Sequence, residues 1–379
     1  MSLLAVSPYR AMSADRGLLL IVALVAMTGI AAVGSAAVSH AGFNGQIAST
    51  VAKHLRDIVL GLAMATVAYS VSLDRYQQYS RLMVVLSIIG LILVFVPGIG
   101  HEVNGSKRWI KLGLFNFQPS EMVKVVAILY TSDYVVRQQQ SLTDTVGGVI
   151  RPVVLFAIVA GLVLLEPDLG ATIVIFASIM LVLFLGGAQM RTFIMLVVAG
   201  LLAVTVLAVG STYRLERVMS FLNPWDDPFG SDYQLLNSLI AVGRGGLNGV
   251  GWSSGYQKLG FLPEAHTDFI FAVWSEELGF VGVTLLIALY AGLIVTIWQR
   301  ARRAEAAGLL YGALVAYGVA FWFSFQAFVN TAVNLGMLPP KGITLPLISF
   351  GGSSLLVTFA ALGIVLRVSV ETMEREGKL

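Results

Sequence analysis

The sequence predicts an all-α, polytopic membrane protein that crosses the bilayer about ten times. Of its 379 residues, 57% are hydrophobic and only 12% are charged, whereas soluble domains carry about 25% charged residues. The mean hydropathy is +0.84. Uncharged runs recur along the whole chain, and their lengths are close to the ~20 residues that cross a hydrocarbon core.

Ten mainly apolar runs are the predicted spans. They lie near residues 17–39, 55–73, 82–98, 119–136, 152–166, 170–187, 192–210, 269–298, 307–330 and 351–369. Helices are the expected form, because the alternating pattern of barrel strands is missing and lipid offers no partners to open backbone groups. The first run is longer than the apolar core of a signal peptide, so we expect it to be a retained span. Residues 1–379 are therefore expected to form one transmembrane domain, with a large extracytoplasmic loop, about 211–268, before the eighth helix.

Composition excludes several classes of function. The chain has no cysteine, which excludes disulfides and thiolate chemistry. Four histidines are spread along the chain, so a multi-histidine metal site is not expected. The net charge of +3 is small, and no nucleic-acid partner is expected.

Basic residues in the loops predict the orientation, because cytoplasmic loops carry an excess of Lys and Arg. With both termini in the cytoplasm, 13 of the 24 basic residues lie inside: Arg10, Arg16, Arg75, Arg81, Arg137, Arg151, Arg191, Arg300, Arg302, Arg303, Arg367, Arg375 and Lys378. The other 11 lie outside or at the outer membrane edge: Lys53, Arg56, Lys107, Arg108, Lys111, Lys124, Arg214, Arg217, Arg244, Lys258 and Lys341. This outer set runs against the usual bias, and a site for an anionic ligand would need it.

Asp268 lies where a polar outer loop turns into an apolar segment, in the stretch SSGYQKLGFLPEAHTDFIFAVWSEELG (253–279). A carboxylate at such an edge is costly to desolvate and indicates a functional site. Two other outer loops, 98–120 and 334–354, are also polar. In the last of them, the prolines break helices and Gly351-Gly352-Ser353 can open the final helix.

Motifs in these loops resemble those of the SEDS family (shape, elongation, division and sporulation), bacterial membrane glycosyltransferases that polymerise peptidoglycan. They are GSKRWIKLG (105–113), QPSEMVK (118–124), EPDLG (166–170), NPWDDPFGSDYQ (223–234), LPEAHTDFIFA (262–272), EELG (276–279) and LPLISFGGSS (345–354). The resemblance covers nearly the whole chain from about Arg75. The motif NPWDDPFGSDYQ and the lysine Lys341 resemble the division-type branch rather than the elongation-type branch.

The resemblance implies an inverting glycosyl transfer between two lipid II molecules, with undecaprenyl pyrophosphate as the leaving group. The attacking sugar hydroxyl then needs a general base, and Asp268 is the candidate. A second interpretation is that Asp268 caps the helix that starts near Phe269, since Asp is a favoured N-cap. The resemblance favours catalysis.

The leaving pyrophosphate needs positive charge, and the candidates are Arg108, Lys124, Arg244 and Lys341. Glu121 and Lys124 lie three residues apart in a helix expected to begin at Pro119, so a structural ion pair is an equal alternative for Lys124. Arg108 beside Trp109 is equally compatible with an interfacial anchor.

Supporting roles fall to Glu121, His266, Thr267 and Ser353. His266 either binds substrate or orients Asp268, although a lone histidine is more often structural. In EPDLG, Pro167 lets the chain turn, and Glu166 and Asp168 are expected to be structural. Of Glu276 and Glu277, at least one is expected to pair with a basic residue.

The resemblance also implies partners and a place in the cell. The partners are lipid II, membrane lipids, a class B penicillin-binding protein (FtsI type) and a divisome subcomplex of small bitopic proteins (FtsQ, FtsL and FtsB type). The expected location is the bacterial cytoplasmic (inner) membrane at the division septum, with a periplasmic active site. No cofactor is certain, although a divalent cation (Mg or Mn) can enter with the pyrophosphate. The competing function is a lipid II flippase, but its polar groups would lie at mid-membrane rather than at the outer face.

Overall fold

A computed structural model describes residues 15–37, 46–103, 106–111, 113, 116–210, 221, 224–225, 230 and 233–378. Arg10, Arg214, Arg217 and most of the motif at 223–234 lie outside these residues. Each of the ten predicted spans corresponds to one long helix: α2 (Arg16–Ala36), α3 (Gln46–Ser70), α5 (Ser80–Leu93), α6 (Pro119–Arg137), α8 (Val146–Leu165), α9 (Leu169–Leu185), α10 (Met190–Val209), α13 (Ile270–Ala306), α14 (Leu310–Asn334) and α15 (Gly352–Arg375).

Within the described residues, six of these helices are long and apolar enough to cross a membrane. These six are α2, α8, α10, α13, α14 and α15, while α5 and α9 are apolar but shorter. Helices α3 and α6 carry more polar residues; α3 packs against α15, and α6 packs against α9. The chain is therefore a polytopic, all-α membrane protein.

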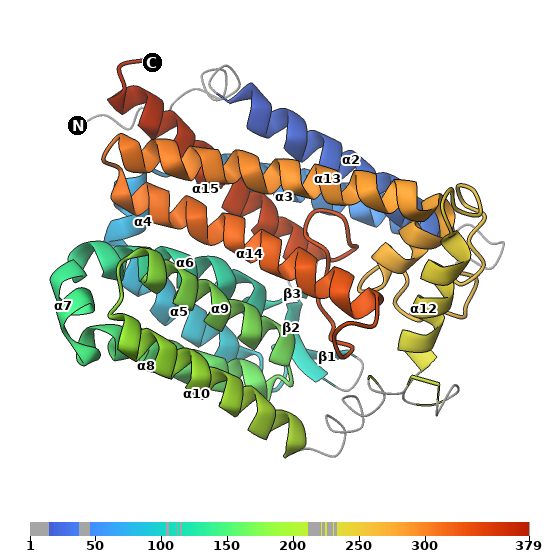
Figure 1. Cartoon of the computed structure of the whole chain (residues 1–379), viewed down its shortest axis with the longest axis horizontal. Coiled ribbons are helices and arrows are strands. Elements are labelled where there is room, and N and C mark those ends of the chain that lie inside the picture. Colours follow the sequence, from blue (N-terminus) through green and yellow to red (C-terminus); the bar gives the residue numbers. More distant parts are fainter. Residues whose placement is uncertain are drawn as a thin grey trace.

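The bundle has two different ends (Figure 1). One end carries the start of α2, the end of α15 and the short helices α4 (Leu73–Gln78) and α7 (Gln139–Asp144). The other end, called the outer end here after the predicted orientation, carries α12 (Tyr233–Gly245) and three short strands. These strands, β1 (Gly100–Val103), β2 (Ser106–Lys111) and β3 (Asn116–Phe117), form an antiparallel sheet in the order β1-β2-β3. The sequence did not predict this sheet or α12.

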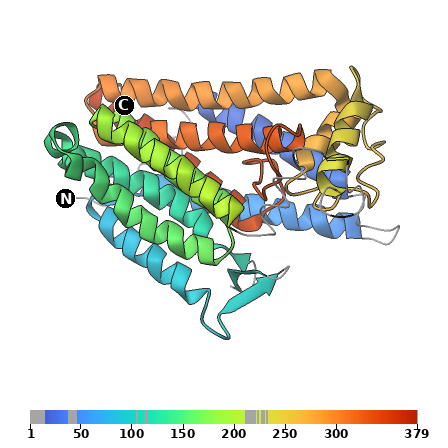
Figure 2. The ribbon, with the colours of Figure 1, turned by 60° about the horizontal axis from the view of Figure 1, so that its bottom comes forward.

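Two groups of helices share the apolar core. The larger core cluster joins α2, α3, α13, α14 and α15, and the second joins α5, α6, α8 and α9. Figure 2 shows the blue-green and green helices of the second group inclined to the orange helix α13. Helices α6 and α14 contribute residues to both clusters, so they connect the groups.

Local sequence explains where several helices begin. Pro119 occupies the first turn of α6, where its missing N–H is not needed. Asp168 caps α9, accepting a hydrogen bond from the Ala171 N–H at 2.9 Å. Gly351 stands at the cap position of α15, as its motif predicts.

Candidate active site

Asp268 lies at the outer end, two residues before α13. The helix begins at Ile270 and its cap position is Phe269, so the alternative role of Asp268 as the N-cap is wrong. The side chain is partly buried. Its carboxylate lies against the backbone of Gly342: a methyl group added at Gly342 would come within 3.1 Å of Asp268 Oδ2.

Three consecutive backbone carbonyls fix the chain at this point. The His266 carbonyl accepts a hydrogen bond from the Phe350 N–H at 2.9 Å, and the Thr267 carbonyl accepts one from Ser349 Oγ at 2.6 Å. The Asp268 carbonyl accepts two, from Nδ2 of Asn330 at 2.8 Å and from Nδ2 of Asn334 at 3.1 Å. The loop before α13 is therefore bound to α14 and to the segment that precedes α15.

The side chains of His266 and Thr267, which precede Asp268, make contacts of their own. The His266 ring lies 5.4 Å from the Phe350 ring, and Thr267 Oγ1 donates to a carboxylate oxygen of Glu264 at 2.8 Å. Lys341 is partly buried, and its carbonyl accepts a hydrogen bond from the Ile343 N–H at 2.9 Å. The structure thus brings Asp268, His266, Thr267 and Lys341 into one region.

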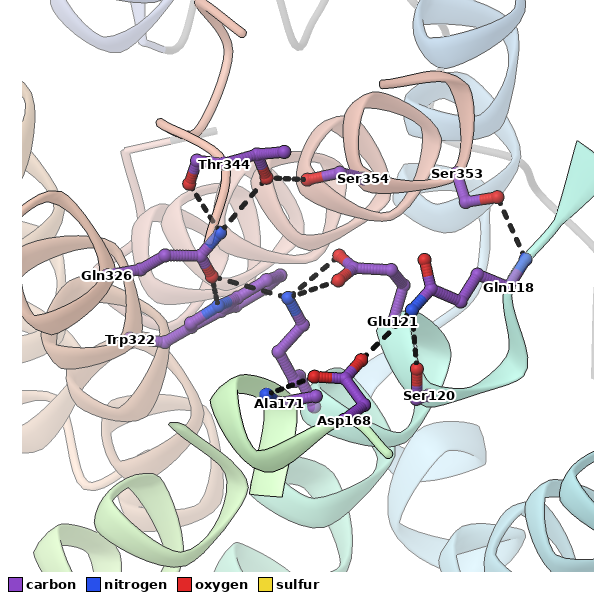
Figure 3. Close-up of polar contacts among 11 residues, drawn as sticks. Gln118, Ser120, Glu121, Asp168, Ala171, Trp322, Gln326, Thr344, Ser353 and Ser354 are labelled. Atoms are coloured by element: carbon purple, nitrogen blue, oxygen red, sulfur yellow. Dashed lines mark hydrogen bonds and ion pairs between the residues drawn. The ribbon is translucent and has the colours of Figure 1, made fainter. Parts of the chain in front are cut away.

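Lys124 lies in a second, buried cluster, and Figure 3 shows its neighbours Glu121, Trp322 and Gln326. Its Nζ lies 2.7 Å from both Glu121 carboxylate oxygens and 5.2 Å from the centre of the Trp322 ring. Lys124 is 2% exposed and Glu121 8%. The predicted ion pair is confirmed, and its burial makes it an interior contact rather than an open binding surface.

Gln326 connects this ion pair to the segment that carries Lys341. Its Oε1 accepts hydrogen bonds from Trp322 Nε1 at 2.6 Å and from Lys124 Nζ at 3.3 Å. Its Nε2 donates to the Thr344 carbonyl at 2.8 Å. Thr344 Oγ1 in turn lies 3.0 Å from Ser354 Oγ, and Figure 3 shows the chain of contacts.

Ser353 binds the backbone of the first outer loop. Its Oγ donates to the Asn116 carbonyl at 2.7 Å and accepts from the Gln118 N–H at 2.9 Å. The side-chain amide of Gln118 donates a hydrogen bond from Nε2 to Asp168 Oδ2 at 3.1 Å (Figure 3). Ser353 therefore joins the start of α15 to the entry of α6.

Arg108 holds the turn between α8 and α9. Its Nε donates to the Glu166 carbonyl at 2.6 Å and its Nη2 to the Pro167 carbonyl at 2.9 Å. The Glu166 side chain is fully buried, and both carboxylate oxygens have no hydrogen-bond partner in the described residues. Burial and the neighbouring charge of Asp168 raise the pKa of Glu166 to about 8, against the opposing effect of Arg108.

The two adjacent glutamates of EELG hold the loop after α12, as the sequence predicts for at least one of them. Glu277 pairs with Lys258 at 2.6 Å, and both side chains are almost completely buried. Glu276 accepts hydrogen bonds from the Tyr256 and Gln257 N–H groups at 3.0 and 3.1 Å. Its contact with Arg244 is longer, 3.4 Å, and Arg244 is 43% exposed.

The predicted site residues therefore fall into groups. Asp268, His266, Thr267 and Lys341 lie together, and Lys124 and Glu121 reach them through Gln326 and Thr344. Ser353, Arg108 and Arg244 bind neighbouring loops. The sequence analysis missed Gln326, Asn330 and Asn334. Their signal was present, because amide side chains repeated every four residues in an apolar helix are costly unless they are bound.

Metal-ligating side chains do not gather here. Across the described ranges, no group of three or more His, Asp or Glu side chains could hold a metal ion. Asp268 supplies one carboxylate, which is the usual protein share when a divalent cation is held mainly by phosphate oxygens.

Comparisons with known proteins extend over nearly all of the chain. The model of the cell cycle protein family FtsW, RodA and SpoVE matches residues 15–374. A probable peptidoglycan glycosyltransferase FtsW of Thioalkalivibrio sulfidiphilus is 45% identical over 361 residues, which cover 95% of this chain and 90% of that protein.

Two further matches agree with this result. A protein of the same description from Coxiella burnetii is 48% identical over 320 residues, covering 84% of this chain and 86% of its own. A solved structure, described as structural coordination of polymerization and crosslinking by a peptidoglycan synthase complex, matches with a TM-score of 0.78 at 30% identity. It covers 95% of this chain and 99% of its own.

Proposed function

This chain belongs to the FtsW, RodA and SpoVE family of cell cycle proteins, and we propose that Asp268 is its catalytic base. The chain is a peptidoglycan glycosyltransferase of the division type, because relatives of that description share 45% and 48% identity with it over most of both chains. It is also a multi-pass membrane protein.

The proposed reaction joins two lipid II molecules. The 4-hydroxyl of the acceptor sugar attacks the anomeric carbon of the donor, a new C–O bond forms, and the bond to undecaprenyl pyrophosphate breaks with inversion. The hydroxyl proton passes to the Asp268 carboxylate. A positioned base contributes typically ~10²–10⁴-fold to such a step, and the single observation that carries the assignment is that the loop of Asp268 is fixed by three successive carbonyls.

Lys341 is the proposed cation for the leaving pyrophosphate. It directly precedes Gly342, whose backbone lies against the Asp268 carboxylate, so its charge is close to where the anomeric bond breaks. Lys124 is buried against Glu121, and we assign it to holding the Gln326–Thr344 contact. Arg108 and Arg244 keep the outer rim positive while they hold loops.

A divalent cation, Mg²⁺ or Mn²⁺, fits this site as a companion of the pyrophosphate. Asp268 would be its protein ligand, and it would neutralise charge on the leaving group. The chain's own residues position the two substrates and accept the proton. Chelation with EDTA followed by return of Mg²⁺ measures the contribution of the cation to the polymerisation rate.

We place the site on the periplasmic side of the inner membrane at the division septum, with both termini in the cytoplasm. The relative in the peptidoglycan synthase complex is described as coordinating polymerization with crosslinking. This supports a class B penicillin-binding protein of the FtsI type as a partner. The FtsQ, FtsL and FtsB type subcomplex is proposed as the regulator.

The test is polymerisation of purified lipid II in detergent. Asp268→Asn should lower glycan strand formation ~10²–10⁴-fold, to a residual rate, and leave lipid II binding and the melting temperature unchanged. Asp144→Asn, at the exposed end of α7 on the opposite side, is the matched control and should keep full activity. Strand formation near the wild-type rate in Asp268→Asn would reject the assignment, and no strands from any variant would favour the flippase, because detergent leaves no membrane to flip across.

A further inference from the structure

Three amide side chains form a ladder along one face of α14. Gln326, Asn330 and Asn334 are spaced four residues apart, and each is at most 2% exposed. Residues at this spacing lie above one another on a helix. The helix is otherwise apolar enough to cross a membrane, so three buried amides are expensive there unless their hydrogen bonds are used.

Asn330 uses both N–H groups of its amide on two different loops. Nδ2 donates to the Asp268 carbonyl at 2.8 Å and to the Ile343 carbonyl at 2.6 Å. Asn334 gives a second donor to the Asp268 carbonyl at 3.1 Å, and its Oδ1 accepts the Ala272 N–H at 3.1 Å. Asn330 therefore joins the backbone of Asp268 to the segment around Lys341.

That bridge sets the geometry of the proposed reaction. Ile343 is itself bonded through its N–H to the Lys341 carbonyl at 2.9 Å, so fixing Ile343 also fixes the turn that carries Lys341. The same turn places Gly342 against the Asp268 carboxylate. The Asn330 amide therefore connects the backbone of Asp268 to the turn that carries Lys341.

We propose that Asn330 is a positioning residue that fixes the Asp268 carboxylate relative to Lys341. The inference rests on the proposed function of Asp268 and adds a residue that acts through it without touching substrate. Misplacement of a reacting group by about 1 Å can cost ~10²-fold in rate. Loss of the Asn330 bridge should therefore lower turnover and leave substrate binding almost intact.

The experiment measures initial rates of lipid II polymerisation against lipid II concentration. Asn330→Ala should lower kcat about 10- to 100-fold with KM changed less than about twofold. Asn237→Ala is the matched control: Asn237 is 7% exposed, lies in α12 at the same end, and donates only within its helix, to the Tyr233 carbonyl at 2.7 Å. It should keep wild-type kcat.

A double-mutant cycle separates positioning from general destabilisation. In the Asp268→Asn background, adding Asn330→Ala should change the residual turnover less than about twofold, because the group it positions is already gone. Asn330→Leu keeps the side-chain size without N–H donors and should repeat the kcat loss while the protein remains monodisperse in detergent.

The possible results distinguish the two claims. Full activity in Asp268→Asn rejects the proposed base. If Asp268→Asn loses activity but Asn330→Ala keeps the wild-type kcat, the proposed base stands and the positioning role is rejected. A further large loss in the double mutant has the same consequence. Failure of both Asn330 variants to fold would also overturn it, because Asn330 would then be a structural residue.

Discussion

At Asp268 the backbone and the side chain are held by different neighbours. The carbonyl is bound by two amides of α14, while the carboxylate lies beside a glycine of the facing loop. A fixed backbone limits the conformations of the side chain, and a facing residue without a side chain lets the carboxylate lie close to the backbone of the loop. Both features are needed to hold a base close to a reacting hydroxyl.

The glycine beside Asp268 gives a direct test of this arrangement. Gly342→Ala places a methyl group 3.1 Å from Asp268 Oδ2, so the carboxylate must move by a few tenths of an ångström. We expect polymerisation to fall about tenfold or more with little change in melting temperature, because Gly342 is exposed.

Gly351→Ala is the matched control for this test. Its added methyl group makes only ordinary contacts of 3.7 Å, with Ser354 and Thr344. Activity should stay close to wild type. Equal effects of the two substitutions would contradict the close contact of Gly342 with the Asp268 carboxylate.

Glu166 predicts a pH dependence of stability. Its folded-state pKa, about 8, lies above the ordinary glutamate value of 4.5, so the folded protein holds a proton that the unfolded chain releases. Stability is full below about pH 4.5 and falls as the pH rises to about 8, by at most about 1.4 kcal/mol per pH unit. Glu166→Gln removes this loss, so its melting temperature should exceed that of the wild type at pH 8 and approach it at pH 5.

The control for Glu166 is Glu102→Gln, since Glu102 is an exposed carboxylate of β1 at the same end. Its melting curve should follow that of the wild type at both pH values. A Glu166→Gln melting temperature that differs from wild type by the same amount at pH 5 and pH 8 would show that Glu166 does not hold this proton.

Single residues could be predicted from the sequence where a recognisable motif contained charged groups that are costly to desolvate. Asp268 was identified because an acid at the edge of a span is expensive, and the Glu121–Lys124 pair because helical spacing brings i and i+3 together. Asn330 was missed because neutral amides stand out less than charges in a hydrophobic run. Only the fold shows that its two hydrogen bonds reach loops 62 and 13 residues away.

Among the elements, α13 has an internal break that accepts the loop after α12. Gly279 has a φ of 61°, and a side chain there would collide with the Gly249 N atom at 2.3 Å. The loop bonds to the opened helix on both sides: Val250 N–H to the Glu276 carbonyl at 3.0 Å, and Phe280 N–H to the Gly246 carbonyl at 2.9 Å. Backbone groups freed by the break are thereby satisfied.

The Lys258–Glu277 pair secures this docked loop. Ser35 near the end of α2 donates to Glu277 at 2.6 Å and accepts from Lys258 Nζ at 2.8 Å. Lys258→Met would leave a buried carboxylate without its cation, which typically costs about 3–5 kcal/mol. We expect a clear drop in melting temperature and faster proteolysis of the loop.

A second substitution distinguishes an unpaired charge from lost packing. Glu277→Gln added to Lys258→Met removes the uncompensated charge and should recover part of the stability. Arg244→Met is the control. The Arg244 side chain is 43% exposed and lies 3.4 Å from Glu276, and ion pairs with an exposed partner contribute about 1 kcal/mol or less. If Lys258→Met melts like Arg244→Met, the buried pair does not hold the loop.

The long helices could be predicted from the sequence, but the short elements at the outer end could not. Ten helices were predicted, and six of those in the described residues are long and apolar enough to cross a membrane. The helix α12 and the sheet β1–β3 were not predicted, since short elements outside the membrane follow tertiary contacts more than local pattern. The predicted span 269–298 was too short at its C-terminal end. Helix α13 continues to Ala306, beyond the charged residues that mark the membrane edge.

Across the whole molecule, charge separates the two ends. The described members of the predicted inside set lie at one end of the bundle, the end that carries α4 and α7 (Figure 1). They lie in α4, at the start of α2, α5, α8 and α10, toward the end of α6, α13 and α15, or, for Lys378, just after α15. Asp15 and Arg300 illustrate this end, because they form an ion pair at 2.5 Å between the start of α2 and the last turns of α13. These short basic flanks are the basis for proposing that this end lies in the cytoplasm.

The absence of native cysteine makes this orientation testable with single introduced thiols. Leu247→Cys at the outer end, where Leu247 is 71% exposed, should react with a membrane-impermeant maleimide in intact spheroplasts. Gln140→Cys, on an exposed position of α7, should react only after lysis. The reverse pattern would put Asp268 on the cytoplasmic side, and a polymerase site there could not deliver glycan strands to a wall outside the membrane.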